Sequence, residues 1–305
     1  MKKFSIKLSV AMAFAASMLV LSALFSCAAN SESNVDVPEE LTEWNAAEVL
    51  GEDYKKHTTI KIPKGVVRIE EKAFYGCSAQ SIIIPETVTR IGDAKRWGVG
   101  VYYGVFEGCE NLQSIEIPES VTYIGGEAFE GCKSLKTVTL HEGLTTLKGS
   151  TFSYCDSLKE IRIPQSVTYI GGYTFYKCSS LKKVVLTNNI SVIEGSTFDN
   201  CTALAEITIP EGVTSIGDYA FYECKNLTRI TLPASLSKID KYAFDRCSSL
   251  TSVTILAKNP PSIPDYSGFR PFTGNDNITF YVPKDSVEVY KTQWEIYKDS
   301  ITAIW

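Results

Sequence analysis

Residues 155–177 read CDSLKEIRIPQSVTYIGGYTFYK, and the pattern begins again at Cys178. The same 23-residue interval recurs without a slip along one series of cysteines: Cys109, Cys132, Cys155, Cys178, Cys201, Cys224 and Cys247. Cys77 belongs to this series and is offset by an insertion. A fixed period of this length indicates a solenoid, in which each repeat forms one coil of a stack.

Each repeat predicts one short strand and one return segment. In Ile161-Arg162-Ile163 the side chains alternate, so both isoleucines face inward and the arginine faces outward. The proline that follows has no backbone N–H and ends the strand. A Phe three residues before each cysteine enters the core from a return segment that we expect to be a helical or 3₁₀ turn. One coil buries too few apolar groups to offset the entropy lost when it is ordered, so stability must come from stacking.

The repeats predict one domain with about ten short parallel strands on one face. It covers residues 59–283, with an insertion near 93–103 and an irregular loop at 257–277. The open ends of the stack need covers. Apolar residues at helical spacing predict a helical N-terminal cap at 41–58 and a helical C-terminal cap at 284–305. These residues are Leu41, Trp44, Ala47 and Leu50 in the first cap, and Val287, Tyr290, Trp294 and Tyr297 in the second.

The first residues read as an export signal. Within residues 1–26, lysines precede an apolar run that carries no charge. The motif LFSC at residues 24–27 resembles a bacterial lipobox, which implies lipid attachment at Cys27. An uncleaved anchor helix and ordinary signal cleavage are the alternatives, and all three place the rest of the chain outside the cytoplasm. Residues 27–40 are polar and acidic and predict a flexible tether. We expect a position on the outer membrane or cell surface, with a periplasm-facing position as the alternative.

The charge balance excludes one class of partner. The formal net charge is −5, and the mature chain is more acidic still because the leader carries lysines and no acid. A nucleic-acid partner requires a basic surface that releases counterions, so we expect none. Contact with a membrane is expected through the lipid anchor only.

The repeat and its ending resemble one known family. The pattern Cys-x-x-Leu-x-x-Ile-x-Ile-Pro-x-x-Val-x-x-Ile-Gly-x-x-Ala-Phe over residues 59–283, and the motif YVPKDSVEVY at 281–290, are similar to the BspA-like leucine-rich repeats of bacterial surface proteins, the treponemal class of the repeat. The resemblance implies a leucine-rich-repeat solenoid. It also implies adhesion to host matrix proteins, attachment to other bacteria or engagement of innate receptors, without a shared site motif.

The repeat cysteines predict a structural ladder. One cysteine stands in the same slot of every coil: Cys77, Cys109, Cys132, Cys155, Cys178, Cys201, Cys224 and Cys247. A disulfide needs Cβ atoms about 3.8 Å apart, closer than the spacing of coils provides without distortion. We therefore expect buried thiols, with a few disulfides between adjacent coils as one alternative and metal ligation as another. No metal and no other cofactor is expected.

Catalytic groups are scarce. The two histidines, His57 and His141, do not stand beside a Ser or Cys nucleophile and an orienting acid in any recognisable order. We predict that the chain is not an enzyme.

Binding is the function that remains, and two regions are candidates. The first is the outward face of the strands, with the solvated face of a sheet as the alternative interpretation; its candidate residues are Glu116, Thr139, Glu160, Arg162, Lys183, Val185, Thr208, Arg229 and Thr231. The second is the insertion, where aromatic residues and Arg are typical of interfaces but could also pack locally; its candidates are Arg96, Trp97, Tyr102 and Tyr103. Tyrosines on the return turns predict an outer strip that packs between coils: Tyr173, Tyr176, Tyr219, Tyr222 and Tyr242.

These inferences combine into one expectation. The chain is a monomeric, lipid-anchored surface protein that binds a protein ligand of the host matrix or of a bacterial surface. The alternative is a structural or scaffold lipoprotein of the envelope or periplasm that has no host ligand.

Overall fold

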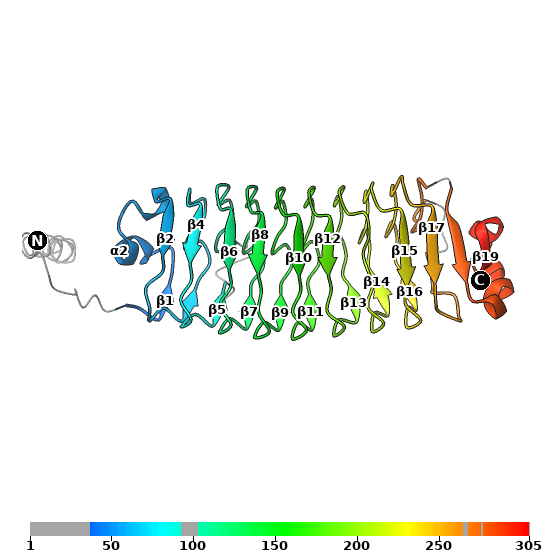
Figure 1. Cartoon of the computed structure of the whole chain (residues 1–305), viewed down its shortest axis with the longest axis horizontal. Coiled ribbons are helices and arrows are strands. Elements are labelled where there is room, and N and C mark those ends of the chain that lie inside the picture. Colours follow the sequence, from blue (N-terminus) through cyan, green and yellow to red (C-terminus); the bar gives the residue numbers. More distant parts are fainter. Residues whose placement is uncertain (1–36, 93–102, 265–267, 276, 305) are drawn as a thin grey trace, which may run out of the picture. The chain divides into compact units, whose positions relative to one another are not determined.

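The computed structural model describes residues 37–92, 103–264, 268–275 and 277–304. The expected signal peptide, the expected lipid-attachment residue Cys27 and most of the expected tether lie outside these ranges. Residues 37–305 form one compact unit, in which successive coils stack along a single axis (Figure 1). The predicted solenoid with short parallel strands is therefore confirmed. Among the described residues, no helix is long and apolar enough to cross a membrane.

One strand of each coil lies on a common face, which we call the front sheet. Its strands within the repeats are β2 (Thr59–Lys61), β4 (Ser81–Ile83), β6 (Ser114–Glu116), β8 (Thr137–Thr139), β10 (Glu160–Arg162), β12 (Lys183–Val185), β15 (Arg229–Leu232), β17 (Ser252–Ile255) and β18 (Thr279–Val282). Strands within a ladder are parallel and pair one repeat apart, as Glu160 does with Lys183. The ladder is interrupted between β8 and β10 and again after β12. The remaining expected strand, at 207–209 between β12 and β15, is reduced to an isolated parallel bridge between Thr208 and Thr231.

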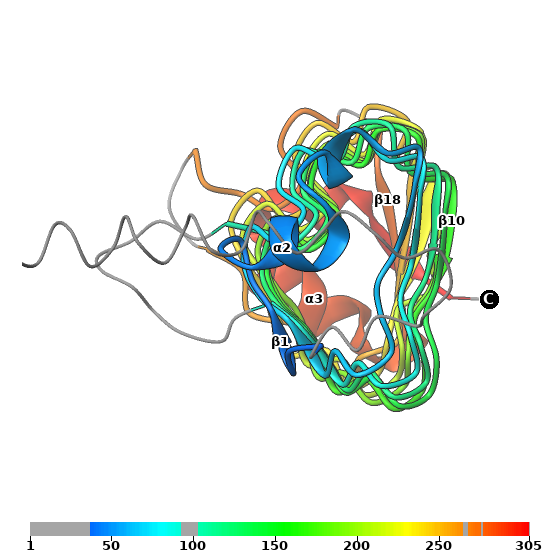
Figure 2. The ribbon, with the colours of Figure 1, turned by 90° about the vertical axis from the view of Figure 1, so that its left-hand side faces the viewer.

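A second series of parallel strands, absent from the prediction, lies on another side of the coils. It consists of β1 (Glu40–Leu41), β3 (Arg68–Ile69), β5 (Arg90–Ile91), β7 (Tyr123–Ile124), β9 (Thr146–Leu147), β11 (Tyr169–Ile170), β13 (Val192–Ile193), β14 (Ser215–Ile216) and β16 (Lys238–Ile239). Viewed down the stack, successive coils superimpose, with β10 and β18 on one side and β1 on another (Figure 2). The second buried pair of each repeat, such as Val167 and Ile170, comes from this strand and the turn before it.

The return segments differ from the helical or 3₁₀ turns that the sequence led us to expect. No helix lies between β2 and β18 in the described residues. The backbone N–H of Phe175 donates to the carbonyl of Thr197 in the next coil, 2.9 Å away, rather than to its own turn. Tyr173 and Lys177 on either side have φ of +60° and +56°. A right-handed helix does not tolerate this conformation, so each return is a chain of turns held by the neighbouring coil.

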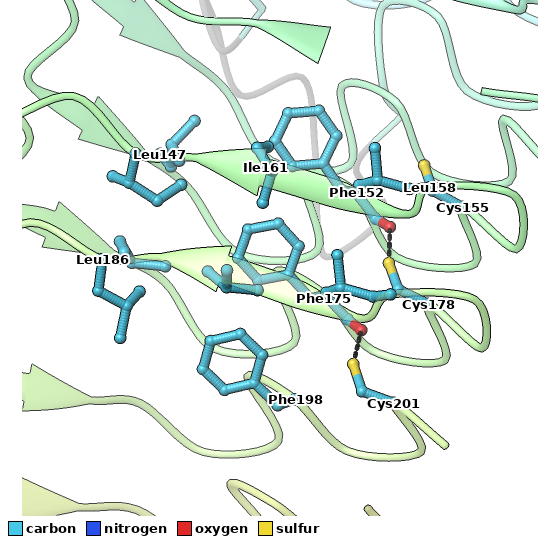
Figure 3. Packing of buried hydrophobic residues seen from close by; sticks show 14 of the residues in the cluster. Leu147, Phe152, Cys155, Leu158, Ile161, Phe175, Cys178, Leu186, Phe198 and Cys201 are labelled. Atoms are coloured by element: carbon cyan, nitrogen blue, oxygen red, sulfur yellow. Dashed lines mark hydrogen bonds between the residues drawn. The ribbon is translucent and has the colours of Figure 1, made fainter. Parts of the chain in front are cut away.

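Stacked phenylalanines form the centre of the core (Figure 3). Phe152, Phe175 and Phe198 are fully buried, with ring centroids 5.8 and 5.5 Å apart and planes within 8° of parallel. The stack continues in both directions, from Phe74 through to Phe272. Phe272 comes from the segment expected to be irregular, yet it lies 5.1 Å from Phe244 with nearly parallel rings. That segment therefore supplies one more Phe to the core.

The cysteines line the stack beside the phenylalanines. All eight ladder cysteines are buried free thiols. The sulfur of Cys178 donates to the carbonyl oxygen of Phe152 in the preceding coil at 3.1 Å, and that of Cys201 donates to Phe175 at 3.1 Å (Figure 3). Each of these carbonyls also accepts a hydrogen bond from the backbone N–H of the cysteine three residues later, as Phe152 does from Cys155 at 3.2 Å. The thiol therefore adds a second hydrogen bond, which links the turn to the next coil.

The N-terminal end is covered differently from the prediction. A short helix, α2 (Ala46–Leu50), and a 3₁₀ turn, η1 (Tyr54–Lys56), lie across the first coil (Figure 2). Trp44 is 89 % exposed and packs nowhere in the cap, because Leu41 belongs to β1 and the helix begins only after Trp44. Tyr54, and not Trp44, covers the exposed end of the Phe stack at Phe74. Its ring meets Phe74 edge-on at 5.9 Å and its hydroxyl donates to the carbonyl of Ala73.

The C-terminal end has a larger cover. It consists of η2 (Lys284–Ser286), α3 (Val287–Gln293), η3 (Glu295–Ser300) and β19 (Ile301–Ala303). Tyr290 and Trp294 are buried as the helical spacing predicts, and Trp294 meets Phe280 edge-on at 5.5 Å. β19, which the sequence did not suggest, pairs in parallel with β18 and adds one more strand to the front sheet.

Candidate binding surface

The front face is the outward surface of the front sheet. Side chains on each strand alternate, so β10 buries Ile161 and exposes Glu160 and Arg162. In-register pairing places equivalent residues of successive coils in two parallel columns, about 4.8 Å apart along each column. The face is therefore a regular grid whose outward residues are held on a rigid scaffold.

Charged side chains gather in the middle of this grid. We call Glu160, Arg162, Lys183, Glu206 and Arg229 the charged centre, and all five are exposed. Four of these residues form one column in which the charge alternates from coil to coil: Glu160, Lys183, Glu206 and Arg229. Only one ion pair within 4 Å forms in this group of described residues, between Arg229 and Glu206 at 3.9 Å, and both side chains are about three-quarters exposed. An exposed pair of this kind contributes little to stability, so these charges remain available to a partner.

Small and hydroxyl-bearing residues surround the charged centre. Thr139, Thr208 and Thr231 are exposed and Val185 is half-buried. Glu116 is exposed, and its Oε1 lies 3.7 Å from Nε2 of His141 at the corner of the next coil. The outward positions that the sequence predicted for the front face therefore lie on one surface.

Of the four candidates in the insertion, the structure describes Tyr103 alone. Arg96, Trp97 and Tyr102 fall outside the described residues. Tyr103 follows them and is half-buried, with its ring 3.7 Å from Nζ of Lys72 and edge-on to Tyr75 at 5.8 Å. This contact joins the first two coils at the turn that carries the Phe stack. Tyr103 is thus not part of the front face.

The outer tyrosines contact one another along the same turns. Tyr219 and Tyr242 of adjacent coils lie 4.9 Å apart, and Tyr173 meets Tyr176 edge-on at 5.7 Å. Tyr176 also meets Tyr154 of the preceding coil edge-on at 5.3 Å. Their arrangement agrees with the expected packing between coils.

The described residues show no metal-binding cluster of three or more His, Cys, Asp or Glu side chains. Burial raises the pKa of Asp199 to about 6 and raises those of Glu107 and Glu130 above their ordinary range. Each of these carboxyls comes one residue after the Phe of its coil; Glu107 accepts a hydrogen bond from the backbone N–H of Gly104, and Asp199 accepts one from the side-chain amide of Asn200. A cavity of about 380 Å³ lies away from the front face, between Pro261, Arg270 and Trp294 of the C-terminal cap.

Two further outward positions of the strands, Ile83 and Glu206, also lie on the front face. Ile83 is a large apolar side chain that is 48 % exposed, and Glu206 completes the alternating column. Strand alternation alone was enough to locate both.

Comparison with known proteins identifies the repeat. The family model described as the BspA type leucine rich repeat region matches in six copies, over residues 52–95, 100–205 and 193–291. No functionally curated protein matches the sequence. A leucine-rich repeat protein of T. pallidum is 32 % identical over 57 % of this chain and 78 % of its own, with a TM-score of 0.51.

Two further solved structures are more distant. One is a leucine-rich repeat protein from Bacteroides ovatus, 25 % identical over 81 % of this chain and 84 % of that chain, with a TM-score of 0.44. The other is a leucine rich cell surface protein from Faecalibacterium prausnitzii, 24 % identical over 72 % of this chain and 64 % of that chain, with a TM-score of 0.41. The family match extends over well more than half of the sequence and follows the coils described above. The chain therefore belongs to the BspA-type leucine-rich repeat family.

Proposed function

We propose that the chain is an exported, lipid-anchored protein that binds a protein ligand, of a host matrix or of another bacterial surface, through its front face. The observation that carries the proposal is the charged centre. Five exposed charges lie on a rigid sheet, and the structure gives them one weak ion pair between them. Membership of a family implicated in adhesion supports the same interpretation.

The shape of the surface favours a macromolecular partner. Small ligands bind in concave, largely apolar pockets. The front face is instead a grid of outward side chains on a sheet, and the cavity noted above is lined by residues around Pro261, Arg270 and Trp294. Its alternating charges suit a protein surface of complementary pattern, which would set orientation and speed of association.

The proposal involves neither catalysis nor a cofactor. Attachment through Cys27 would place the repeats outside the cytoplasm, at the end of a tether of polar residues. Residues 37–305 form a compact unit without the leader, so the repeats can be presented to a partner while the anchor stays in the bilayer.

The test is a binding assay against a panel of extracellular-matrix and bacterial surface proteins. A four-residue charge swap (E160K, K183E, E206K and R229E) reverses every charge of the alternating column and preserves both the alternation and the net charge. We expect at least a tenfold loss of affinity, about 1.4 kcal/mol. The matched control swaps an exposed ion pair away from the front face, D218K with K241D, and should bind as the parent does.

Two outcomes would redirect the proposal. Binding that survives the swap but is lost when residues 93–102 are deleted would assign the site to the insertion. Absence of saturable binding, together with protection from protease on intact cells, would favour the scaffold role. Cleavage of the repeats on intact cells would support display at the surface.

A further inference from the structure

Cys77 and Cys109 stand apart from the rest of the cysteine ladder. Their sulfur atoms are 2.8 Å apart, closer than two unbonded sulfurs normally approach. A disulfide bond is about 2.0 Å long, so about 0.8 Å of movement would close it. All eight ladder cysteines are described, and no other neighbouring pair of them makes a sulfur–sulfur hydrogen bond.

The sequence explains why this pair is different. Ile82 follows Cys77 by five positions, whereas Ile115 follows Cys109 by six. The first coil therefore has one residue fewer between the cysteine and the front strand, and small Ala79 stands where the later coils place a Leu. The shortened turn directs the backbone N–H of Ala79 at the sulfur of Cys77.

The hydrogen bonds of the ladder also stop at Cys77. From Cys109 onward, each sulfur donates to the carbonyl oxygen of the Phe in the preceding coil, at distances from 3.0 to 3.3 Å. No repeat precedes the first coil, and Tyr54 occupies that side of Phe74. Cys77 therefore has no carbonyl acceptor of this kind, and its thiol faces Cys109.

The surroundings of Cys77 favour its thiolate. When Cys109 turns its S–H from the Phe74 carbonyl to Cys77, this hydrogen bond lowers the pKa of the Cys77 thiol. Burial acts in the opposite direction, and the N–H of Ala79 and the charge of Lys55 lower the pKa further. Burial instead raises the pKa of Cys132, Cys178 and their neighbours. The thiolate is the form that attacks a disulfide, so Cys77 is the ladder cysteine suited to begin exchange.

We propose that Cys77 and Cys109 are a site of intramolecular disulfide formation that fastens the first coil to the second. The oxidant is a disulfide, either of an exchange protein or of a small thiol. The Cys77 thiolate attacks one sulfur of the oxidant and displaces the other as a thiolate. The Cys109 thiol then gives up its proton and attacks the Cys77 sulfur, releasing the second thiolate. Two cysteine thiols are oxidised, one disulfide is reduced to two thiols, and the two protons go to the leaving sulfurs.

Both sulfurs are buried in the folded chain, so exchange requires the first coil to open or to be still unpacked. An end coil contacts a repeat on one side only and is therefore among the first parts of a solenoid to open. An exported location would provide an oxidising environment. The chemistry itself depends only on the two coils, whatever ligand the front face binds.

The test uses the full-length chain, purified in detergent, reduced, and then incubated with a mixture of oxidised and reduced glutathione. Remaining thiols are blocked before digestion and peptide mass mapping. We expect one linked pair of peptides that contain Cys77 and Cys109, with a mass lower by two hydrogen atoms than the sum of the reduced peptides. Two fewer thiols should then react under denaturing conditions.

The control variants assign the bond. Cys77→Ser and Cys109→Ser should each abolish the linked pair, whereas Cys224→Ser should leave it unchanged. A fully reduced ladder after oxidation of the parent chain, or a linked pair that joins other cysteines, would overturn the proposal. The peptide map of the parent chain decides this even if a variant fails to fold.

Discussion

Replacing Phe175 by Ala should show whether the Phe stack holds the coils together. The ring is fully buried and lies nearly parallel to Phe152 on one side and Phe198 on the other, with centroids 5.8 and 5.5 Å away. Removing a buried Phe costs about 3–5 kcal/mol. Because two stacked pairs disappear together, each worth about 0.5–1.5 kcal/mol beyond area, we expect a loss near the upper end, about 5 kcal/mol.

Urea unfolding followed by circular dichroism measures this loss as a change in the free energy of unfolding. Phe175→Leu keeps most of the side-chain volume and removes the ring, and we expect it to cost about 2 kcal/mol. The difference between the two variants separates the contribution of ring stacking from that of filling the core. Tyr169→Ala removes an aromatic that is 42 % exposed and should cost less than about 1 kcal/mol. If Phe175→Ala costs no more than Tyr169→Ala, the stack does not stabilise the solenoid and the reasoning fails.

Two other substitutions test the contacts between coils and the buried acids. In Gly171→Ala the new Cβ would lie 2.4 Å from the backbone nitrogen of Gly149, which forces adjacent coils apart and should cost about 3 kcal/mol in thermal unfolding; Gly126→Ala, with its nearest atom at 3.3 Å, should cost much less. Burial raises the pKa of Asp199 to about 6, so the folded chain holds a proton that the unfolded chain releases between about pH 4 and 6, and stability falls as pH rises through that range. Asp199→Asn should therefore be more stable than the parent by about 2 kcal/mol at pH 7 and equal to it below pH 4, and a constant difference across both pH values would contradict this assignment.

The repeat period predicted the coil because inward positions are the same in every repeat. An Ile-x-Ile pair and a Phe before each cysteine recur since each coil must fill the same space. The second strand series could not be read in this way. A segment such as Tyr169–Ile170 is two residues long, and its hydrogen bonds come entirely from the neighbouring coils. These strands therefore depend on contacts between stacked coils, which the sequence of a single repeat does not reveal.

The ends were harder to predict than the middle, for a related reason. Leu41 and Trp44 fall at helical spacing, but Leu41 pairs with the second sheet and leaves Trp44 in solvent. Tyr54 covers the Phe stack although no periodic pattern includes it. Phe272 follows Phe244 by 28 residues instead of 23, and only the ring contact shows that it continues the stack. End residues have no repeat to reveal them.

The outward positions of the front face were located correctly because strand alternation fixes which side chains are exposed. Exposure, however, does not by itself select a ligand. Outward residues can change from coil to coil with little effect on folding, so they carry no repeat that would identify a partner.

The charges of the charged centre can be explained either by the stability of the sheet or by binding to a partner, and the two explanations differ at Arg162. Like charges directly opposite on neighbouring strands are unfavourable, so the alternation of Glu160, Lys183, Glu206 and Arg229 has a reason in the sheet itself. Arg162 does not. Its in-register neighbour is Val185, the equivalent residue of the preceding coil is Thr139, and no described carboxylate lies within ion-pair distance of its guanidinium. A charge that the sheet neither needs nor neutralises, at the centre of a rigid exposed grid, is what a surface built for a partner would carry, so Arg162 is the residue at which the binding explanation is strongest.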